Sequence, residues 1–124
     1  MSGASTLRAL RGATTVDADT PEAIAERIQE LLATIMDRNG LLQDDVVSII
    51  FTATPDITSA FPAAGARDIG FGGVPLICAS EIGVPGGTPR CLRVLLHVTT
   101  TRSRAQLRHV YLHGARGLRD DLPV

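Results

Sequence analysis

The chain of 124 residues contains no lysine, so all 12 of its basic residues are arginines. The absence of lysine excludes a lysine Schiff base and a Walker-type phosphate loop, because both need that residue. The formal net charge is −1, so no overall field favours nucleic acid or a membrane surface. No apolar run approaches the roughly 20 residues that span a bilayer. The N-terminus also lacks the basic-then-apolar order of a signal peptide, so we expect a protein of the cytoplasm.

Cysteine is scarce as well. The two cysteines, Cys78 and Cys91, are too few and too far apart for a standard zinc motif. A disulfide between them stays open, and nothing in the sequence requires it. His109 and His113 alternate with Tyr111, but two histidines without a third ligand are a weak metal signal, so we expect no metal centre.

The rest of the composition suits one folded unit. Hydrophobic residues make up 44% of the chain, which is enough to build one core in a domain of this length. We expect residues 1–6 to form a mobile N-terminal tail and residues 7–124 to form a single domain, with 118–124 as its C-terminal tail.

Capping residues and prolines mark where the helices begin. Thr20 and Pro21 suit the N-cap and the first position of a helix that ends at Gly40. Pro62 opens a shorter helix that runs to about Ile69. Strands are expected over residues 7–13, 46–52, 74–79, 91–100 and 109–112, with a short helical turn after Ser103. The order β-α-β-α-β-β-α-β predicts a single α/β or α+β layer structure.

Arg11 and Arg93 each stand inside an apolar, strand-like segment. Alternation along residues 91–98 puts Arg93 on the face opposite Leu92 and Leu96. An arginine that faces a core must be paired, because the desolvation of an unpaired ion is costly. Two alternatives stay open: each guanidinium pairs with a carboxylate of the protein, or the two together grip a small anionic ligand.

Five short segments carry the remaining information, and they extend over nearly the whole chain. They are Arg11-Gly12-Ala13-Thr14-Thr15; Ala53-Thr54-Pro55-Asp56 followed by Ala60-Phe61-Pro62-Ala63 and Arg67; Val74-Pro75-Leu76-Ile77-Cys78 with Glu81; Gly86-Gly87 followed by Cys91-Leu92-Arg93-Val94; and Arg108-His109-Val110-Tyr111-Leu112. In this order and spacing, over about residues 7–122, the chain resembles the trimeric α/β chorismate mutases, a small monofunctional class unrelated to the all-helical one. The resemblance implies a mixed sheet with helices on one face, assembled as a homotrimer with a pseudo-α/β-barrel.

Members of that family convert chorismate to prephenate on the route to phenylalanine and tyrosine. The reaction is a unimolecular Claisen rearrangement that needs no cofactor and no metal. The enzyme must hold the substrate in its reactive diaxial form and stabilise charge on the ether oxygen as the C–O bond breaks. By resemblance, Arg93 would donate to the ether oxygen and one carboxylate. Arg11 would bind a carboxylate with help from the Tyr111 hydroxyl, and Glu81 would meet the ring hydroxyl and balance the arginine charge.

The resemblance also implies substrate contacts from other segments and from a second subunit. Cys78 would join Glu81 at the ring hydroxyl, and Phe61 would pack on the substrate. Arg67 would add positive charge at the mouth of the site, and Arg119 would help to cover it. In the trimer, a first group of residues would face a second across a subunit interface. The first group is Phe61, Arg67 and Cys78; the second is Arg11, Glu81, Arg93 and Tyr111.

The chain departs from the family pattern at Ala64, where a lysine is frequent, and at Ile77, where a threonine is frequent. Both departures bear on affinity more than on reaction type. Simpler roles remain open for the substrate-binding candidates: a buried apolar residue for Cys78, a core or interface residue for Tyr111, solvated charges for Arg67 and Arg119. A trimeric module that senses a small carboxylate metabolite without turnover is the alternative function. A third hypothesis, an enzyme with Cys78 as nucleophile, lacks a base near it in sequence.

Overall fold

The computed structural model describes residues 4–118. Its strands are β1 (Thr6–Thr15), β2 (Val46–Ala53), β3 (Leu76–Ser80), β4 (Cys91–Thr100) and β5 (Val110–Tyr111). Its α-helices are α1 (Pro21–Arg38) and α2 (Pro62–Arg67), with 3-10 turns at Gln43–Asp45, Phe71–Gly73, Arg104–Gln106 and His113–Ala115. The order of strands and helices predicted from the sequence is confirmed, and the predicted turn after Ser103 is the 3-10 turn at Arg104–Gln106. The other three 3-10 turns were not predicted.

Local chemistry explains where α1 begins and ends. The Thr20 hydroxyl accepts the N–H of Ala23 at 3.2 Å and caps the first turn, and Pro21 occupies the first helical position. At the other end Asn39 is the C-cap, and Gly40 follows it with a φ of +61°, a conformation that glycine adopts without strain.

Three predicted elements extend beyond the ends that the structure gives them. The helix α2 ends at Arg67 rather than near Ile69, with Asp68 as its C-cap. The strand β3 begins at Leu76, because Pro75 has no N–H to donate to the ladder. The strand β5 has two residues, because the His109 side chain, rather than its main chain, accepts the N–H of Arg11.

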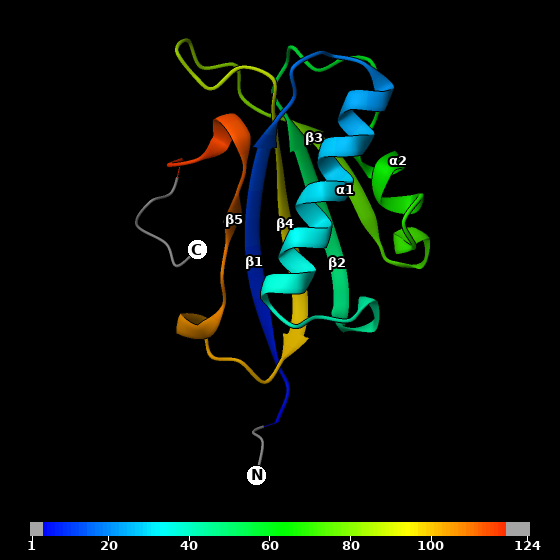
Figure 1. Ribbon diagram of the computed structural model, residues 1–124, viewed down its shortest axis with the longest axis vertical. Helices are drawn as coiled ribbons and strands as arrows, with labels where there is room; N and C mark the ends of the chain where they lie inside the picture. The colour runs from blue at the N-terminus through cyan, green and yellow to red at the C-terminus, as the bar shows by residue number, and fades with distance from the viewer. Residues whose placement is uncertain (1–3, 119–124) are drawn as a thin grey trace.

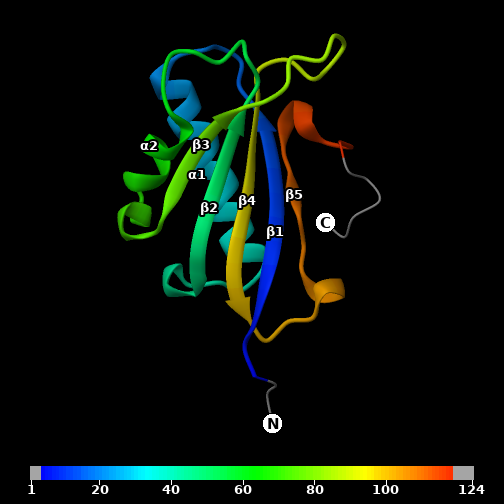
Figure 2. The same cartoon turned by 180° about the vertical axis from the view of Figure 1, so that it is seen from behind.

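The strands form one mixed sheet in the order β3-β2-β4-β1-β5. The strand β4 is antiparallel to both β1 and β2, whereas the outer strands β3 and β5 run parallel to their neighbours. Both α-helices lie on one face of this sheet (Figure 1), and the view from behind shows the strands with no helix in front of them (Figure 2). We call these the covered face and the open face. The predicted fold class is confirmed.

The core fills the space between the covered face and α1. Residues that alternate along the strands point into it and are 0% exposed, among them Leu10, Phe51 and Leu96. Close packing leaves no room for a side chain at the glycine where the two α-helices meet. A Cβ on Gly65 would lie 2.9 Å from Ala25 Cα, so this glycine allows α2 to approach α1.

The structure also bears on the expectations about a membrane span, a disulfide and the two ends of the chain. Among residues 4–118, no helix is long and apolar enough to cross a membrane. Cys78 and Cys91 are free thiols. The expected tails, residues 1–6 and 118–124, lie mostly outside the described residues, although β1 already begins at Thr6.

Candidate active site

The open face carries a hollow of about 370 Å³ that Arg11, Arg93 and Tyr111 line together with Thr52. These four side chains come from four neighbouring strands. The register explains how they meet: Thr52 is opposite Arg93, Arg93 is opposite Ala13, and Ala13 is opposite Tyr111. A row of residues therefore crosses the sheet, and the small Ala13 leaves space between the larger side chains on either side of it.

Glu81 joins this row from the loop that follows β3. Its two carboxylate oxygens share the N–H of Arg93 Nε, at 3.0 and 3.1 Å, and one of them accepts from the Thr52 hydroxyl at 2.6 Å. The side chains of Arg93 and Glu81 are 35% and 16% exposed, so the ion pair is partly shielded from water. Glu81 contacts Arg93 through Nε. The two terminal nitrogens of the Arg93 guanidinium therefore have no carboxylate partner among residues 4–118.

Arg11 differs from Arg93 in its pairing. Its backbone N–H donates to His109 Nδ1 at 2.9 Å, which fixes the strand. Its half-buried guanidinium makes no ion pair or hydrogen bond with any residue that the structure describes. Among residues 4–118, the pairing with a protein carboxylate therefore applies to Arg93 and not to Arg11.

A set of hydrogen bonds holds the start of β4, two residues before Arg93. The Asp56 carboxylate accepts the Arg90 N–H at 2.8 Å and the Thr54 hydroxyl proton. Thr54 Oγ1 accepts the Cys91 N–H at 3.0 Å in turn. The hydrogen bond from the Thr54 hydroxyl is the main cause that lowers the pKa of Asp56 below its ordinary value. These contacts position the strand that carries Arg93.

Phe61 and Cys78 line a different hollow, of about 380 Å³, between β3 and the start of α2. Phe61 is 72% exposed. Arg67 is exposed at the C-terminal end of α2. Within the described part of the chain, no histidine or carboxylate lines this hollow, so Cys78 has no base there to activate it as a nucleophile.

The sequence-predicted residues thus fall into two groups within one chain. The open-face hollow and its edge bring together Arg11, Glu81, Arg93 and Tyr111, whereas the apolar hollow brings together Phe61 and Cys78. Arg119 lies outside the described residues. Sequence reasoning missed Thr52, a threonine in a β-rich segment with no motif of its own. It also missed the anchoring role of Thr54 and Asp56, although both stand in a quoted segment.

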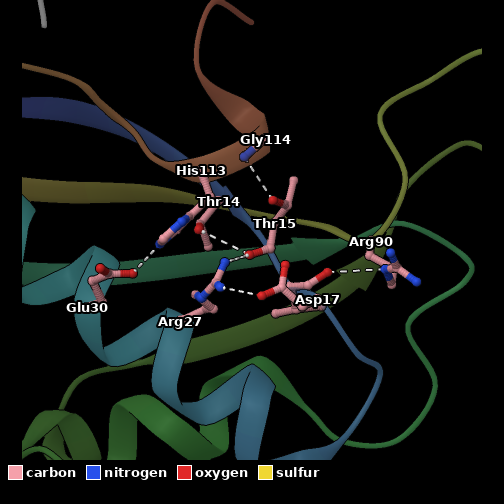
Figure 3. A network of polar contacts seen from close by, with 9 residues as sticks. Thr14, Thr15, Asp17, Arg27, Glu30, Arg90, His113 and Gly114 are labelled. Carbon is pink, nitrogen blue, oxygen red and sulfur yellow. Dashed lines mark hydrogen bonds and ion pairs between the residues drawn. The ribbon is translucent and has the colours of Figure 1, made fainter.

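His113 and Glu30 form a contact between the end of the described chain and α1, with His113 Nε2 2.8 Å from Glu30 Oε1. Nearby, the Thr15 hydroxyl accepts the Gly114 N–H and the Thr15 carbonyl accepts from Arg27 (Figure 3). His113 therefore has a structural partner, and His109 accepts from Arg11. Within residues 4–118 no group of three or more histidines, cysteines or carboxylates lies close enough to hold a metal ion.

The positions at which the chain departs from the family pattern are both on the surface. Ala64 is an exposed residue of α2, and Ile77 is 62% exposed on β3. Neither side chain belongs to the lining of the open-face hollow.

Comparison with known proteins agrees with this arrangement. The model of the family described as chorismate mutase type I matches residues 7–122. Chorismate mutase AroH of Thermus thermophilus is 48% identical over 117 residues, which cover 94% of this chain and 96% of the relative. Chorismate mutase AroH of Bacillus subtilis (strain 168) is 42% identical over 119 residues, covering 95% and 94% of the two chains.

A solved structure extends the likeness to three dimensions. The chorismate mutase from Clostridium thermocellum superimposes with a TM-score of 0.86 at 46% sequence identity, covering 88% of this chain and 97% of that one. The match of the family model over nearly the full length, the identity of these relatives and the shared fold lead to one conclusion. The chain belongs to the chorismate mutase type I family.

Proposed function

We propose that the open-face hollow binds chorismate and converts it to prephenate. The observation that carries this proposal is the pair of arginines in one hollow. Arg93 has a carboxylate partner there, and Arg11 has none among residues 4–118. The substrate is a dicarboxylate with an ether oxygen. A hollow that supplies fixed positive charge therefore matches both its ground state and the charge that develops as the C–O bond breaks.

Each side chain has a role that follows from its position. Arg93 stands in the centre of the row, with Nε held by Glu81, so its terminal nitrogens donate to the ether oxygen and to one carboxylate. Arg11 binds the other end of the substrate as a carboxylate, beside Tyr111. Glu81 holds Arg93 in place and accepts a hydrogen bond from the ring hydroxyl of the substrate. Because the rearrangement is unimolecular, conformational restraint and electrostatics suffice, and no nucleophile or cofactor takes part.

We further propose that the complete site forms between neighbouring copies in a homotrimer. Phe61 and Cys78 line a hollow of their own, separate from the arginine hollow. No helix of the described chain covers the open face (Figure 2). A cyclic trimer places the apolar hollow of one copy against the arginine hollow of the next, which excludes water from the substrate. Free thiols at both cysteines support work in the reducing cytoplasm.

The direct test follows the ultraviolet absorbance of chorismate with purified protein. We expect the wild type to consume the diene and form prephenate, and Arg93→Ala to lose that activity. Arg38→Ala, at an exposed position in the last turn of α1, is the matched control and should retain it. A well-folded wild-type protein without turnover would contradict the proposal and favour the sensor of small carboxylates.

Assembly is tested by dilution. Sedimentation should give the mass of a trimer, and activity per chain should fall once the protein is diluted below the concentration at which the trimer dissociates. A fully active monomer would contradict the shared site and leave the chemistry of the open face untouched.

A further inference from the structure

The main-chain N–H of Arg11 donates to a side chain at the edge of the sheet where β1 meets β5. Two residue pairs join these strands in a parallel ladder, the last of them Ala13 with Tyr111. Continued by two residues toward the start of β1, this ladder would give the Arg11 N–H the carbonyl of Arg108 as its acceptor. The acceptor is instead His109 Nδ1, at 2.9 Å.

The end of α1 explains why Arg108 does not serve as the acceptor. Asn39, the C-cap of α1, is 1% exposed, and its amide contacts both main-chain groups of Arg108. Asn39 Oδ1 accepts the Arg108 N–H at 2.8 Å, and Asn39 Nδ2 donates to the carbonyls of Arg108 and Ile35, each at 2.9 Å. The chain is therefore held against α1 at Arg108, and the imidazole of the next residue, His109, supplies the acceptor for Arg11.

The chemistry of the His109 ring suits this contact. The residue is 8% exposed, so water does not compete freely for the bond. The accepting Nδ1 carries no hydrogen, which puts the hydrogen of the neutral ring on Nε2. A separation of 2.9 Å is that of an ordinary N–H hydrogen bond, so the ring takes the place of a main-chain carbonyl at this point of β1.

The Arg11 guanidinium depends on its main chain for its position more than the Arg93 guanidinium does. Glu81 holds the side chain of Arg93, whereas that of Arg11 makes no ion pair with a residue between positions 4 and 118. Arg11 is opposite Leu95, two residues along β4 from Arg93, so the two arginines occupy diagonal positions on one face and repel each other. A shift of the main chain at Arg11 therefore moves a guanidinium that no side chain holds in place.

We propose that His109 is a positioning residue for the reaction: its ring fixes the main chain of Arg11, and thereby the guanidinium that binds a carboxylate of chorismate. This inference rests on the proposed function and adds to it a residue that does not line the arginine hollow. Arg11 contacts the carboxylate in the ground state and in the transition state alike. A displaced Arg11 should therefore raise KM and leave kcat nearly unchanged.

Two amide variants test the proposal, because they differ in where they place an acceptor. The side-chain oxygen of asparagine can occupy the position of Nδ1, whereas that of glutamine lies one bond farther from the main chain. We expect His109→Gln to raise KM for chorismate about tenfold, the effect of losing one buried hydrogen bond, and His109→Asn to stay close to the wild type. Combined with Arg11→Ala, the two variants should have equal KM values, because His109 acts through Arg11.

Amide hydrogen exchange supplies a measurement that does not depend on turnover. The Arg11 N–H should be protected in the wild type and in His109→Asn, and should exchange faster in His109→Gln. The Leu112 N–H, which donates to the Ala13 carbonyl at 2.9 Å, is the control within the same ladder and should stay protected in all three proteins.

Equal KM and equal protection of Arg11 in the two amide variants would overturn the inference. It would also be overturned by a loss confined to kcat, or by a difference in KM that persists beside Arg11→Ala, since either result assigns His109 a general structural role. Where His109→Gln does not fold, His109→Asn decides, and a raised KM or an unprotected Arg11 N–H in that variant would contradict the inference. An inactive wild type with the expected protection pattern would support the contact and count against the proposed function alone.

Discussion

The two faces of the sheet are built from the same strands by alternation, yet they differ in nearly every physical respect. On the covered face, Leu10, Phe51 and Leu96 are fully buried under α1. On the open face, Arg11 and Arg93 are only partly buried and line a hollow. The contrast teaches that one face stabilises the fold, while the other holds charge at a fixed position at some cost to stability.

The largest loss of activity should follow replacement of Arg93, at the centre of the open face. Replacing Arg93 by lysine keeps the charge but loses the planar fork that Glu81 holds, so turnover should fall by about 10²–10³-fold. The thermal midpoint should change little, because Arg93 is not part of the core. Chorismate kinetics and a thermal melt of the same sample check both statements. Turnover within a few-fold of wild type would remove Arg93 from the mechanism.

Neighbouring leucines of β4 provide a matched test of stability, since Leu96 points to the covered face and Leu95 to the open face. Leu96→Ala should lower the free energy of unfolding by about 2–5 kcal/mol, as for other fully buried leucines. Leu95→Ala should cost clearly less, because that side chain is partly exposed. Urea unfolding measures both, and the reverse order of the two costs would contradict the division between faces.

Thr52 tests how finely the open face is arranged. Thr52→Val removes the hydrogen bond to Glu81 while keeping the shape of the side chain, and we expect about a tenfold loss of kcat/KM. Thr52→Ser restores a hydroxyl and should recover most of the activity. A valine variant as active as the wild type would show that Arg93 alone is enough to hold Glu81.

The smallest expected effect is on the pH dependence of stability when Asp56 is replaced. Its pKa is lowered in the folded protein, so the carboxylate adds stability that is present above its ordinary pKa of 3.8 and is lost as pH falls through the lowered value. Asp56→Asn should therefore flatten the dependence of the thermal midpoint on pH below about pH 4. Melts of both proteins between acidic and neutral pH provide the measurement. Parallel curves would show that Asp56 does not contribute.

Much of this contrast could be predicted from local sequence. Thr20 and Pro21 define the start of α1 through chemistry confined to one turn. The alternation of apolar residues along β4 correctly separated Arg93 from Leu92 and Leu96. These features depend on neighbours in the chain, which is why sequence patterns capture them.

The remaining features depend on contacts between distant segments. Nothing near Thr52 indicates that its hydroxyl reaches Glu81, because that contact exists only once β2 pairs with β3, the strand that Glu81 follows. The same holds for His109, whose ring replaces a main-chain acceptor for Arg11 and shortens β5. The separation of Phe61 and Cys78 from the arginines of the same chain also required the folded arrangement.

The central claim is that the active site combines the arginine hollow of one copy with the apolar hollow of the next, and a mixture of two defective chains tests it most directly. One chain carries Arg93→Ala. The other carries Phe61→Glu, which places a negative charge in the apolar hollow at an exposed position, away from the core. Each protein alone should be nearly inactive.

After the two chains are refolded together in equal amounts, one interface in about four combines two intact halves, so about a quarter of the wild-type activity should return. Activity that stays at the average of the two separate proteins would contradict the shared site, as would full activity of Phe61→Glu by itself.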